Sequence, residues 1–451
     1  MIETPSLVDQ YCHGVLRTEL GLGTFEAQLA RSEGPPAAGT TFFDTQTGFA
    51  VRRWCPPLLG LEPHCTPARY LARRRELGVL ESGRRLLRGS GITTYLVDTG
   101  LPGDLTGPDE MASTGNADAH EIVRLELLAE QVADTSGTVE SFLANLAESV
   151  HAAAAGAVAF ASVAGVRHGL ALAPEPPGPG EVRGAAGRWL AHRPVGGSLT
   201  DPVLLRHLLW IAVASGRPLQ LHAGLGRVAK VPPAPRRLAH SPALGFARAG
   251  GIPAAGPGES PSTSRTGASA RHTGSTLPHS RLPSSGETPM TPQGPHSGWT
   301  TGLPRYALDA PTPRIDHTDP VLLTDFARAT AGLGTDLVLL HGYPYHRHAA
   351  HLAAAFPHVY ADLGAELVRT GARATGVLAE VLELAPFGKL LFSSGAGGLP
   401  ELHVVGARLF REALARVLGT WVAEGAWSLA DAQRVAGLIA AGNARRVYGL
   451  E

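Results

Sequence analysis

The stretch "LVDQYCHGVL", residues 7 to 16, joins a short apolar run to a polar cluster. Leu7 and Val8 lead into Asp9, and the polar residues end at His13 before apolar residues resume. In α/β proteins, chemistry is placed where buried strands end in polar residues. Strand side chains share a face at every second residue, so Tyr11 and His13 face the same way. The stretch therefore predicts a buried strand that carries Tyr11 where a metal enzyme with His-x-His has its first histidine.

Seven further stretches have the same layout, an apolar run that ends in polar residues or glycine and is followed by helical sequence. They are Ile92 to Gly100, His120 to Glu126, Gly156 to Val166, Arg217 to Gly226, Thr335 to His346, His358 to Glu366 and Gly388 to Gly398. Continuous apolar strands that alternate with helices indicate a parallel sheet. Eight such units predict an α/β fold, a TIM-like (β/α)₈ barrel with its chemistry at the carboxyl ends of the strands.

Residues 231–314 interrupt this pattern after the fifth strand. Pro, Gly, Ser and Thr dominate the segment, and no apolar periodicity persists in it. Such a composition buries too little surface to offset the entropy of ordering, which predicts a long disordered insert. The expected organisation is a first barrel part over residues 1–230, the insert, and the remainder of the barrel over residues 315–451. We expect limited proteolysis to cut between Pro232 and Pro313.

Composition limits the class of protein. The chain of 451 residues has 39 basic and 39 acidic side chains, so it lacks the basic footprint of a nucleic-acid-binding protein. Cys12, Cys55 and Cys65 are too few for a disulfide framework. The N-terminus does not resemble a signal peptide, and the apolar stretch 152–166 is too short to cross a bilayer. These features predict a soluble cytoplasmic protein with a small-molecule substrate and no membrane partner, and they leave homo-oligomer formation open.

Histidines stand at three predicted strand ends. They are His13, His222 and His341. A single buried histidine is more often a structural residue hydrogen-bonded to the backbone. Three imidazoles that a barrel brings to one mouth favour a metal site, because catalytic zinc takes three protein ligands and an open position.

Several motifs together resemble the amidohydrolase superfamily, in its amidohydrolase-related branch of metal-dependent hydrolases and decarboxylases. They are "LVDQYCHG", "FDTQTGFAVRRWCPPLLGLEPH", "DPVLLRHLLW", "LQLHAG", "LLHGYPYH", "GKLLFSSGAGGLPELH" and "LIAAGNARRVYGL". The resemblance covers nearly the whole chain outside the insert. It implies a barrel in which a divalent metal activates water for attack on a carbonyl or similar centre.

The chain departs from the pattern of this family at three positions. Tyr11 stands at the first histidine of His-x-His, and Ala161 stands near the bridging lysine of binuclear members. Gly395 stands at the strand-eight aspartate, which in the family binds metal and accepts a proton from water. The loss of two metal ligands predicts an affinity lower by ~10²–10⁴. The phenol of Tyr11, with an ordinary pKa of ~10, is a poor substitute ligand.

Two hypotheses for function follow. In the first, the protein is an amidohydrolase-related barrel with a degenerate metal site, weakly active or inactive, retained for binding or assembly. In the second, it is an active mononuclear metal hydrolase or decarboxylase. His13 and His222 are then ligands of a divalent metal, for which zinc is the first candidate, and His341 is the catalytic residue. The candidate substrate-binding residues are Arg52, Arg53, Trp54 and Tyr343, although a solvated arginine pair beside a core tryptophan explains the first three equally well.

Overall fold

The computed structural model describes residues 2–4, 6–30, 36–224 and 315–451. The chain on both sides of residues 225–314 contributes to one compact unit. The predicted insert, residues 231–314, lies outside the described residues.

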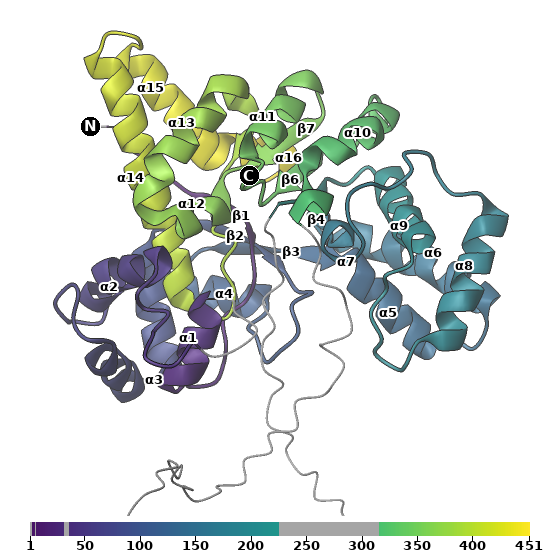
Figure 1. Ribbon diagram of the computed structural model, residues 1–451, viewed down its shortest axis with the longest axis horizontal. Helices are drawn as coiled ribbons and strands as arrows, with labels where there is room; N and C mark the ends of the chain where they lie inside the picture. The colour runs from purple at the N-terminus through teal and green to yellow at the C-terminus, as the bar shows by residue number, and fades with distance from the viewer. Residues whose placement is uncertain (1, 5, 31–35, 225–314) are drawn as a thin grey trace, which may run out of the picture. The chain divides into compact units, whose positions relative to one another are not determined.

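Eight parallel strands form one sheet in sequence order, and Figure 1 shows helices arranged around it. The strands are β1 (Val8–Cys12), β2 (Thr94–Asp98), β3 (Asp118–Arg124), β4 (Ala159–Ser162), β5 (Leu219–His222), β6 (Leu337–Leu340), β7 (Val359–Asp362) and β8 (Leu390–Leu391). Each lies inside or overlaps one of the eight predicted stretches. Hydrogen bonds from Gln10 N to Phe392 O (3.0 Å) and from His13 N to Ala396 O (2.7 Å) link β1 to the segment after β8. The predicted barrel is confirmed.

The barrel interior is a core of its own. Val8, Leu96, Ile122, Val338 and Leu391 pack there, one from each of five strands. Helix α16 (Asn443–Tyr448), the "NARRVY" segment, contributes further buried side chains to the same cluster. Because this helix closes one end of the barrel, polar side chains at the opposite, carboxyl ends of the strands form the mouth.

Strand β1 contains a bulge. Asp9 pairs with Tyr95 and Cys12 pairs with Val97, so three steps on β1 match two steps on β2. A bulge of this kind inserts one extra residue and changes which face the following side chains occupy. Asp9 and Cys12 therefore both face the surrounding helices, whereas Tyr11 and His13 both face the mouth, as the sequence predicts for that pair.

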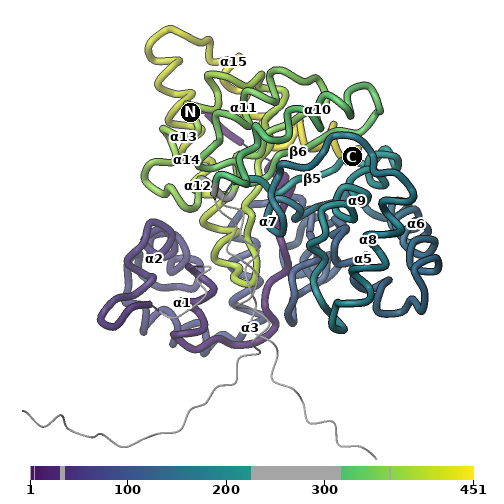
Figure 2. The backbone as a smooth tube through the Cα atoms, turned by 45° about the vertical axis from the view of Figure 1, so that its right-hand side comes forward, coloured from purple at the N-terminus to yellow at the C-terminus, as the bar shows by residue number. Residues whose placement is uncertain are grey.

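Helices cover the outside of the barrel (Figures 1 and 2). In the first part of the chain they are α1 (Leu22–Ala30), α2 (Gln46–Leu58), α3 (Pro67–Ser90), α4 (Pro108–Gly115), α5 (Leu125–Thr135), α6 (Val139–Gly156), α7 (Ala164–Arg167), α8 (Pro179–His192) and α9 (Pro202–Ala214). After residue 315 they are α10 (Thr324–Thr330), α11 (His346–Ala355), α12 (Gly364–Thr370), α13 (Ala374–Leu384), α14 (Pro400–Ala423) and α15 (Leu429–Gly437).

Short helical turns complete the described chain. They are η2 (Ile315–Thr318), η3 (Pro320–Leu323), η4 (Gly371–Arg373), η5 (Phe387–Lys389) and η6 (Leu438–Gly442). Helix α14 packs against α2, α3 and α13. Among the described residues, no helix has both the length and the apolar character needed to cross a membrane.

Candidate active site at the barrel mouth

Tyr11 lies among the three histidines that the sequence singles out. The centre of its ring is 5.2 Å from that of His13, 5.1 Å from that of His222 and 5.3 Å from that of His341. The His222 and His341 rings are 5.0 Å apart. All four side chains are buried, with Tyr11 only 1% exposed. The fold therefore brings the three predicted histidines together, around a phenol ring.

The hydroxyl of Tyr11 lies in a buried polar network. It is 2.9 Å from an oxygen of Asp98 and 3.1 Å from Nε2 of His13, and Arg124 donates to it over 3.1 Å. His13 Nδ1 lies 2.8 Å from the Asp98 carbonyl oxygen, which only accepts, so Nδ1 carries a proton. The single phenol proton is donated either to Asp98 or to Nε2 of neutral His13. The inward nitrogen of His13 is thus engaged by Tyr11.

Asp98 and Arg124 form an ion pair beneath the phenol. Arg124 donates to one Asp98 oxygen through Nε (3.0 Å) and through a second nitrogen, and Gly100 N donates to the other oxygen (2.8 Å). Burial alone would raise the pKa of Asp98, but Arg124 and then His13 offset it, so the pKa lies below its usual value. Burial opposes the charge of Arg124 in the same way, and Asp98 more than compensates, so its pKa is raised. The pair is therefore ionised at neutral pH.

Two close backbone approaches hold the mouth together. A Cβ at Gly100 would lie 2.3 Å from Cβ of Arg124. Only glycine therefore allows the backbone after β2 to approach the Arg124 side chain this closely. A Cβ at Gly224 would lie 2.1 Å from the carbonyl oxygen of His341. His341 itself has a positive φ of 59°, which is uncommon outside glycine and is typical of functional turns.

A second polar network lies deeper in the barrel, and the sequence analysis missed it. The Gln10 side chain donates to Asp362 (3.0 Å), the Gln220 side chain donates to Gln10, and Tyr448 donates to Gln10 Oε1 (2.5 Å). Ser393 donates to the other oxygen of Asp362 (3.0 Å). The sequence did contain an indication of this network, because the side-chain amide of a glutamine inside a buried strand such as "LQLH" needs hydrogen-bond partners.

Asp362 gives this network a pH dependence. Burial raises its pKa to about 6, although hydrogen bonds from Ser393 and Gln10 oppose the rise. The native state then binds more protons than the unfolded state between pH ~4 and ~6, so stability falls as pH rises through this window. We expect Asp362 to remove about 2–3 kcal/mol of unfolding free energy between pH 4 and pH 7. Urea denaturation across this range should show the decline, and Asp362→Asn should flatten it; an unchanged slope in the variant would contradict the assignment.

A third cluster lies on the outer face of β1. The Asp9 carboxylate accepts from Ser394 N (2.7 Å) and Ser394 Oγ (2.5 Å), and His403 Nδ1 of α14 lies 3.5 Å from it. Within the described part of the chain, Asp9, Cys12 and His403 form a group of possible metal ligands whose ligand atoms all lie within 4.8 Å of one another. The three histidines of the mouth do not form such a group within that part of the chain. Burial, followed by Asp9, raises the pKa of Cys12, so the thiol stays protonated.

Glycine at position 395 has a structural consequence. Gly395 has a φ of 55° and donates its N–H to Tyr11 O (3.0 Å), which helps to close the barrel. Gly395, which stands where the family pattern has an aspartate, therefore lies directly beside Tyr11, which stands where the pattern has a histidine.

The structure places the predicted substrate-binding residues in two regions. Tyr343 follows His341 and stacks on His346, with ring centres 5.5 Å apart. Arg53 and Trp54 line a surface pocket of α2 whose lining includes none of the three mouth histidines. Arg52 lies over the Phe49 ring on the same helix, 5.6 Å from its centre. A role for these residues in substrate binding stays a prediction.

Solved structures share this architecture. A Lactobacillus casei ATCC 334 protein classed as a metal-dependent hydrolase superposes with a TM-score of 0.72 at 21% identity, covering 99% of this chain and 96% of that one. A uronate isomerase from Bacillus halodurans C-125 gives a TM-score of 0.54 at 11% identity, covering 100% and 94%. The chain has the same (β/α)₈ barrel fold as these two structures. This confirms the fold that the resemblance implies.

Sequence similarity to known proteins is more limited. No protein-family model matches the chain. A stretch of 117 residues is 38% identical to protein fluG of Emericella nidulans, which is 26% of this chain and only 14% of fluG. The chain thus matches a small part of that relative, and the activity of the whole relative does not transfer to it.

The mouth does not fit the metal that the resemblance implies. An ion bound by His13, His222 and His341 lies ~2.0–2.1 Å from each ligating nitrogen, which requires space between the imidazoles. The Tyr11 ring lies within 5.3 Å of all three ring centres. Arg124, which donates to the phenol oxygen, would repel a cation bound there. The metal-ligand role of His13 and His222, and the catalytic role of His341, stay predictions.

Proposed function

We propose that this protein is an amidohydrolase-related barrel with a degenerate metal site, retained for binding a small molecule rather than for metal-dependent hydrolysis. The observation that carries the proposal is the position of Tyr11, between three imidazoles and with its hydroxyl held by Asp98, His13 and Arg124. A phenol fixed in this way takes the place of the missing imidazole, and its hydroxyl is already bound to Asp98 and Arg124.

Loss of the general base supports the same proposal. In the superfamily pattern, the strand-eight carboxylate accepts a proton from the attacking water, a contribution worth ~10²–10⁴ in rate. Glycine at position 395 has no side chain to do this. Asp98 is ionised, but it is bound to Arg124 and Tyr11. Its lowered pKa also makes it a weak proton acceptor. Both the ligand set and the proton acceptor of the superfamily are therefore incomplete.

A second candidate function is an active mononuclear hydrolase or decarboxylase. It is favoured by the convergence of His13, His222 and His341 on one point, with the His222 and His341 rings 5.0 Å apart. It requires the Tyr11 ring to leave this point, which would break the contacts of its hydroxyl with Asp98 and Arg124.

Thermal unfolding with metal and chelator separates the two candidates. A ligand of the native state stabilises it by RT ln(1 + [L]/Kd), so a tight site makes Tm depend on free metal. We expect zinc, manganese and EDTA each to shift Tm by less than about 2 °C, because the mouth lacks a fitting ligand set. A drop of many degrees in EDTA that zinc reverses, and that His222→Ala abolishes, would overturn the proposal in favour of the hydrolase.

A further inference from the structure

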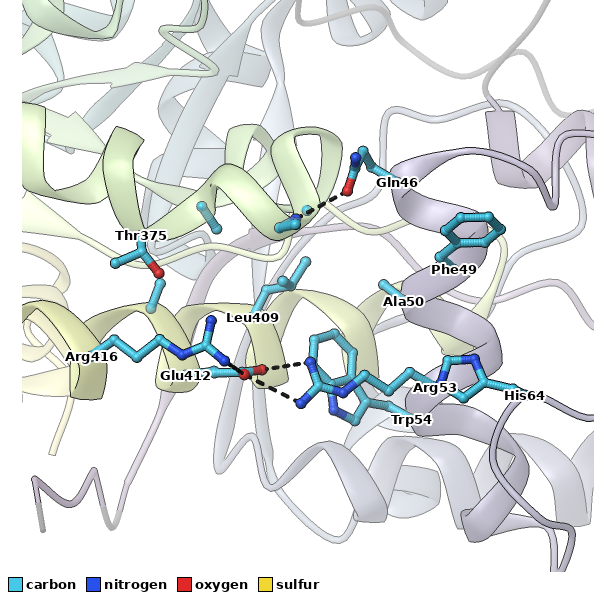
Figure 3. Close-up of a pocket in the computed structure, with 14 residues that line it drawn as sticks. Gln46, Phe49, Ala50, Arg53, Trp54, His64, Thr375, Leu409, Glu412 and Arg416 are labelled. Atoms are coloured by element: carbon cyan, nitrogen blue, oxygen red, sulfur yellow. Dashed lines mark hydrogen bonds and ion pairs between the residues drawn. The ribbon is translucent and has the colours of Figure 1, made fainter.

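A pocket on the outer surface lies apart from the mouth. It has a volume of about 350 Å³ and is lined by residues of α2, α14 and the η4–α13 segment. Figure 3 shows Arg53 of α2 and Arg416 of α14 approaching Glu412 from opposite sides. A volume of this size falls in the lower range of small-molecule sites.

The charges in this pocket do not cancel. Arg53 donates to both oxygens of Glu412, over 3.0 and 3.2 Å, and Arg416 also donates to Glu412. Within the described chain, the Arg, Lys, Asp and Glu side chains that line the pocket are these three alone. Two guanidinium groups therefore share one carboxylate, which leaves a net charge of +1 on these groups. Each guanidinium has five N–H groups, more than the bonds to Glu412 use. The pocket therefore offers positive charge, and N–H groups beyond those bound to Glu412, to an anion.

Aromatic and aliphatic groups supply the rest of the wall. The guanidinium of Arg53 lies over the Trp54 ring, 4.6 Å from its centre. Phe49 is 52% exposed at the edge of the pocket, and Ala50 and Leu409 also line it. An exposed phenylalanine beside paired guanidinium groups suits a ligand with a flat apolar body and one anionic end.

Local contacts fix the pocket in shape. Thr45 caps α2 by accepting from Gly48 N (3.0 Å). The side-chain oxygen Oε1 of Gln46 accepts from Ala372 N (3.0 Å), which ties the start of α2 to η4 and leaves the side-chain NH₂ of Gln46 as a further donor (Figure 3). Preorganised walls lower the entropic cost of binding.

We propose that this pocket binds a small aromatic carboxylate, with the carboxylate on Arg53 and Arg416 and the ring against Trp54 and Phe49. The site is independent of the mouth and of its proposed function. It also places the candidate substrate-binding residues Arg53 and Trp54 at a pocket apart from the mouth.

Isothermal titration of the full chain with 2-naphthoate tests this proposal, with neutral 2-naphthamide as the matched probe. We expect saturable binding of one naphthoate with Kd of about 1 mM or tighter. Arg53→Ala and Arg416→Ala should each weaken it by about tenfold or more, since each removes a charge-assisted contact. Arg328→Ala, which removes an arginine 67% exposed on α10, is the control and should leave Kd unchanged.

Three results would overturn the proposal. They are absence of saturable naphthoate binding, equal affinity for naphthamide, and equal Kd values in Arg416→Ala and Arg328→Ala. Arg416 is 59% exposed, so its replacement should leave the fold intact, and circular dichroism of each variant checks this.

Discussion

Replacement of Arg124 by methionine should lower the free energy of unfolding by about 3–5 kcal/mol, the cost of removing one partner of a buried ion pair. The side chains of Arg124 and Asp98 are 2% and 0% exposed. Without the guanidinium, Asp98 retains Tyr11 and Gly100 as donors but loses its ion-pair partner. Urea denaturation of the variant and the parent at pH 7 measures the difference.

Two further variants make this result specific. Arg17→Met removes an exposed arginine that pairs with Asp104 and Glu110, and it should cost less than about 1 kcal/mol. Adding Asp98→Asn to Arg124→Met should recover part of the loss, because the uncompensated carboxylate is then gone. If Arg124→Met costs no more than Arg17→Met, the buried pair does not organise the mouth as described.

The double variant Tyr11→His, Gly395→Asp should bind one divalent ion per chain, with an affinity ~10²–10⁴ higher than that of the parent. The first change supplies an imidazole in place of the phenol among His13, His222 and His341, and it also frees Nε2 of His13. The second supplies a carboxylate ligand and a proton acceptor. Zinc titration followed by calorimetry and by Tm measures the gain.

The backbone at position 395 works against this gain. Its φ of 55° is left-handed, which costs a residue with Cβ about 1–2 kcal/mol, although Asp tolerates this region better than most residues. Gly395→Asn in the same Tyr11→His background carries a similar backbone cost without the charge, and it is the matched control. Equal zinc affinity in the Asn and Asp double variants would show that a carboxylate at position 395 is not a ligand.

The eight strands were predictable because parallel barrel strands are apolar on both faces and end in polar residues. "LQLH" and "LVLL" stand out for this reason without any knowledge of their neighbours. Convergence of His13, His222 and His341 followed from the closed topology, since every strand end of a barrel faces one mouth.

The contacts at the mouth were less predictable. Asp98 and Arg124 could be placed at strand ends, but their pairing beneath Tyr11 depends on side-chain directions that periodicity does not give. The bulge in β1 contains no glycine or proline that would indicate it in the sequence. The outward position of Cys12 beside Asp9 was therefore not predicted. The Gln10–Asp362–Ser393 network joins strands more than 300 residues apart in sequence, which local patterns do not reveal.

Elemental analysis of the parent protein, after dialysis against metal-free buffer, tests most directly whether Tyr11 and Gly395 have ended metal binding at the mouth. We expect zinc, manganese and iron each to remain far below one ion per chain in the parent, while the Tyr11→His, Gly395→Asp variant retains one. A parent protein that retains one ion per chain, and loses it in His13→Ala or His222→Ala, would show that the mouth still binds metal.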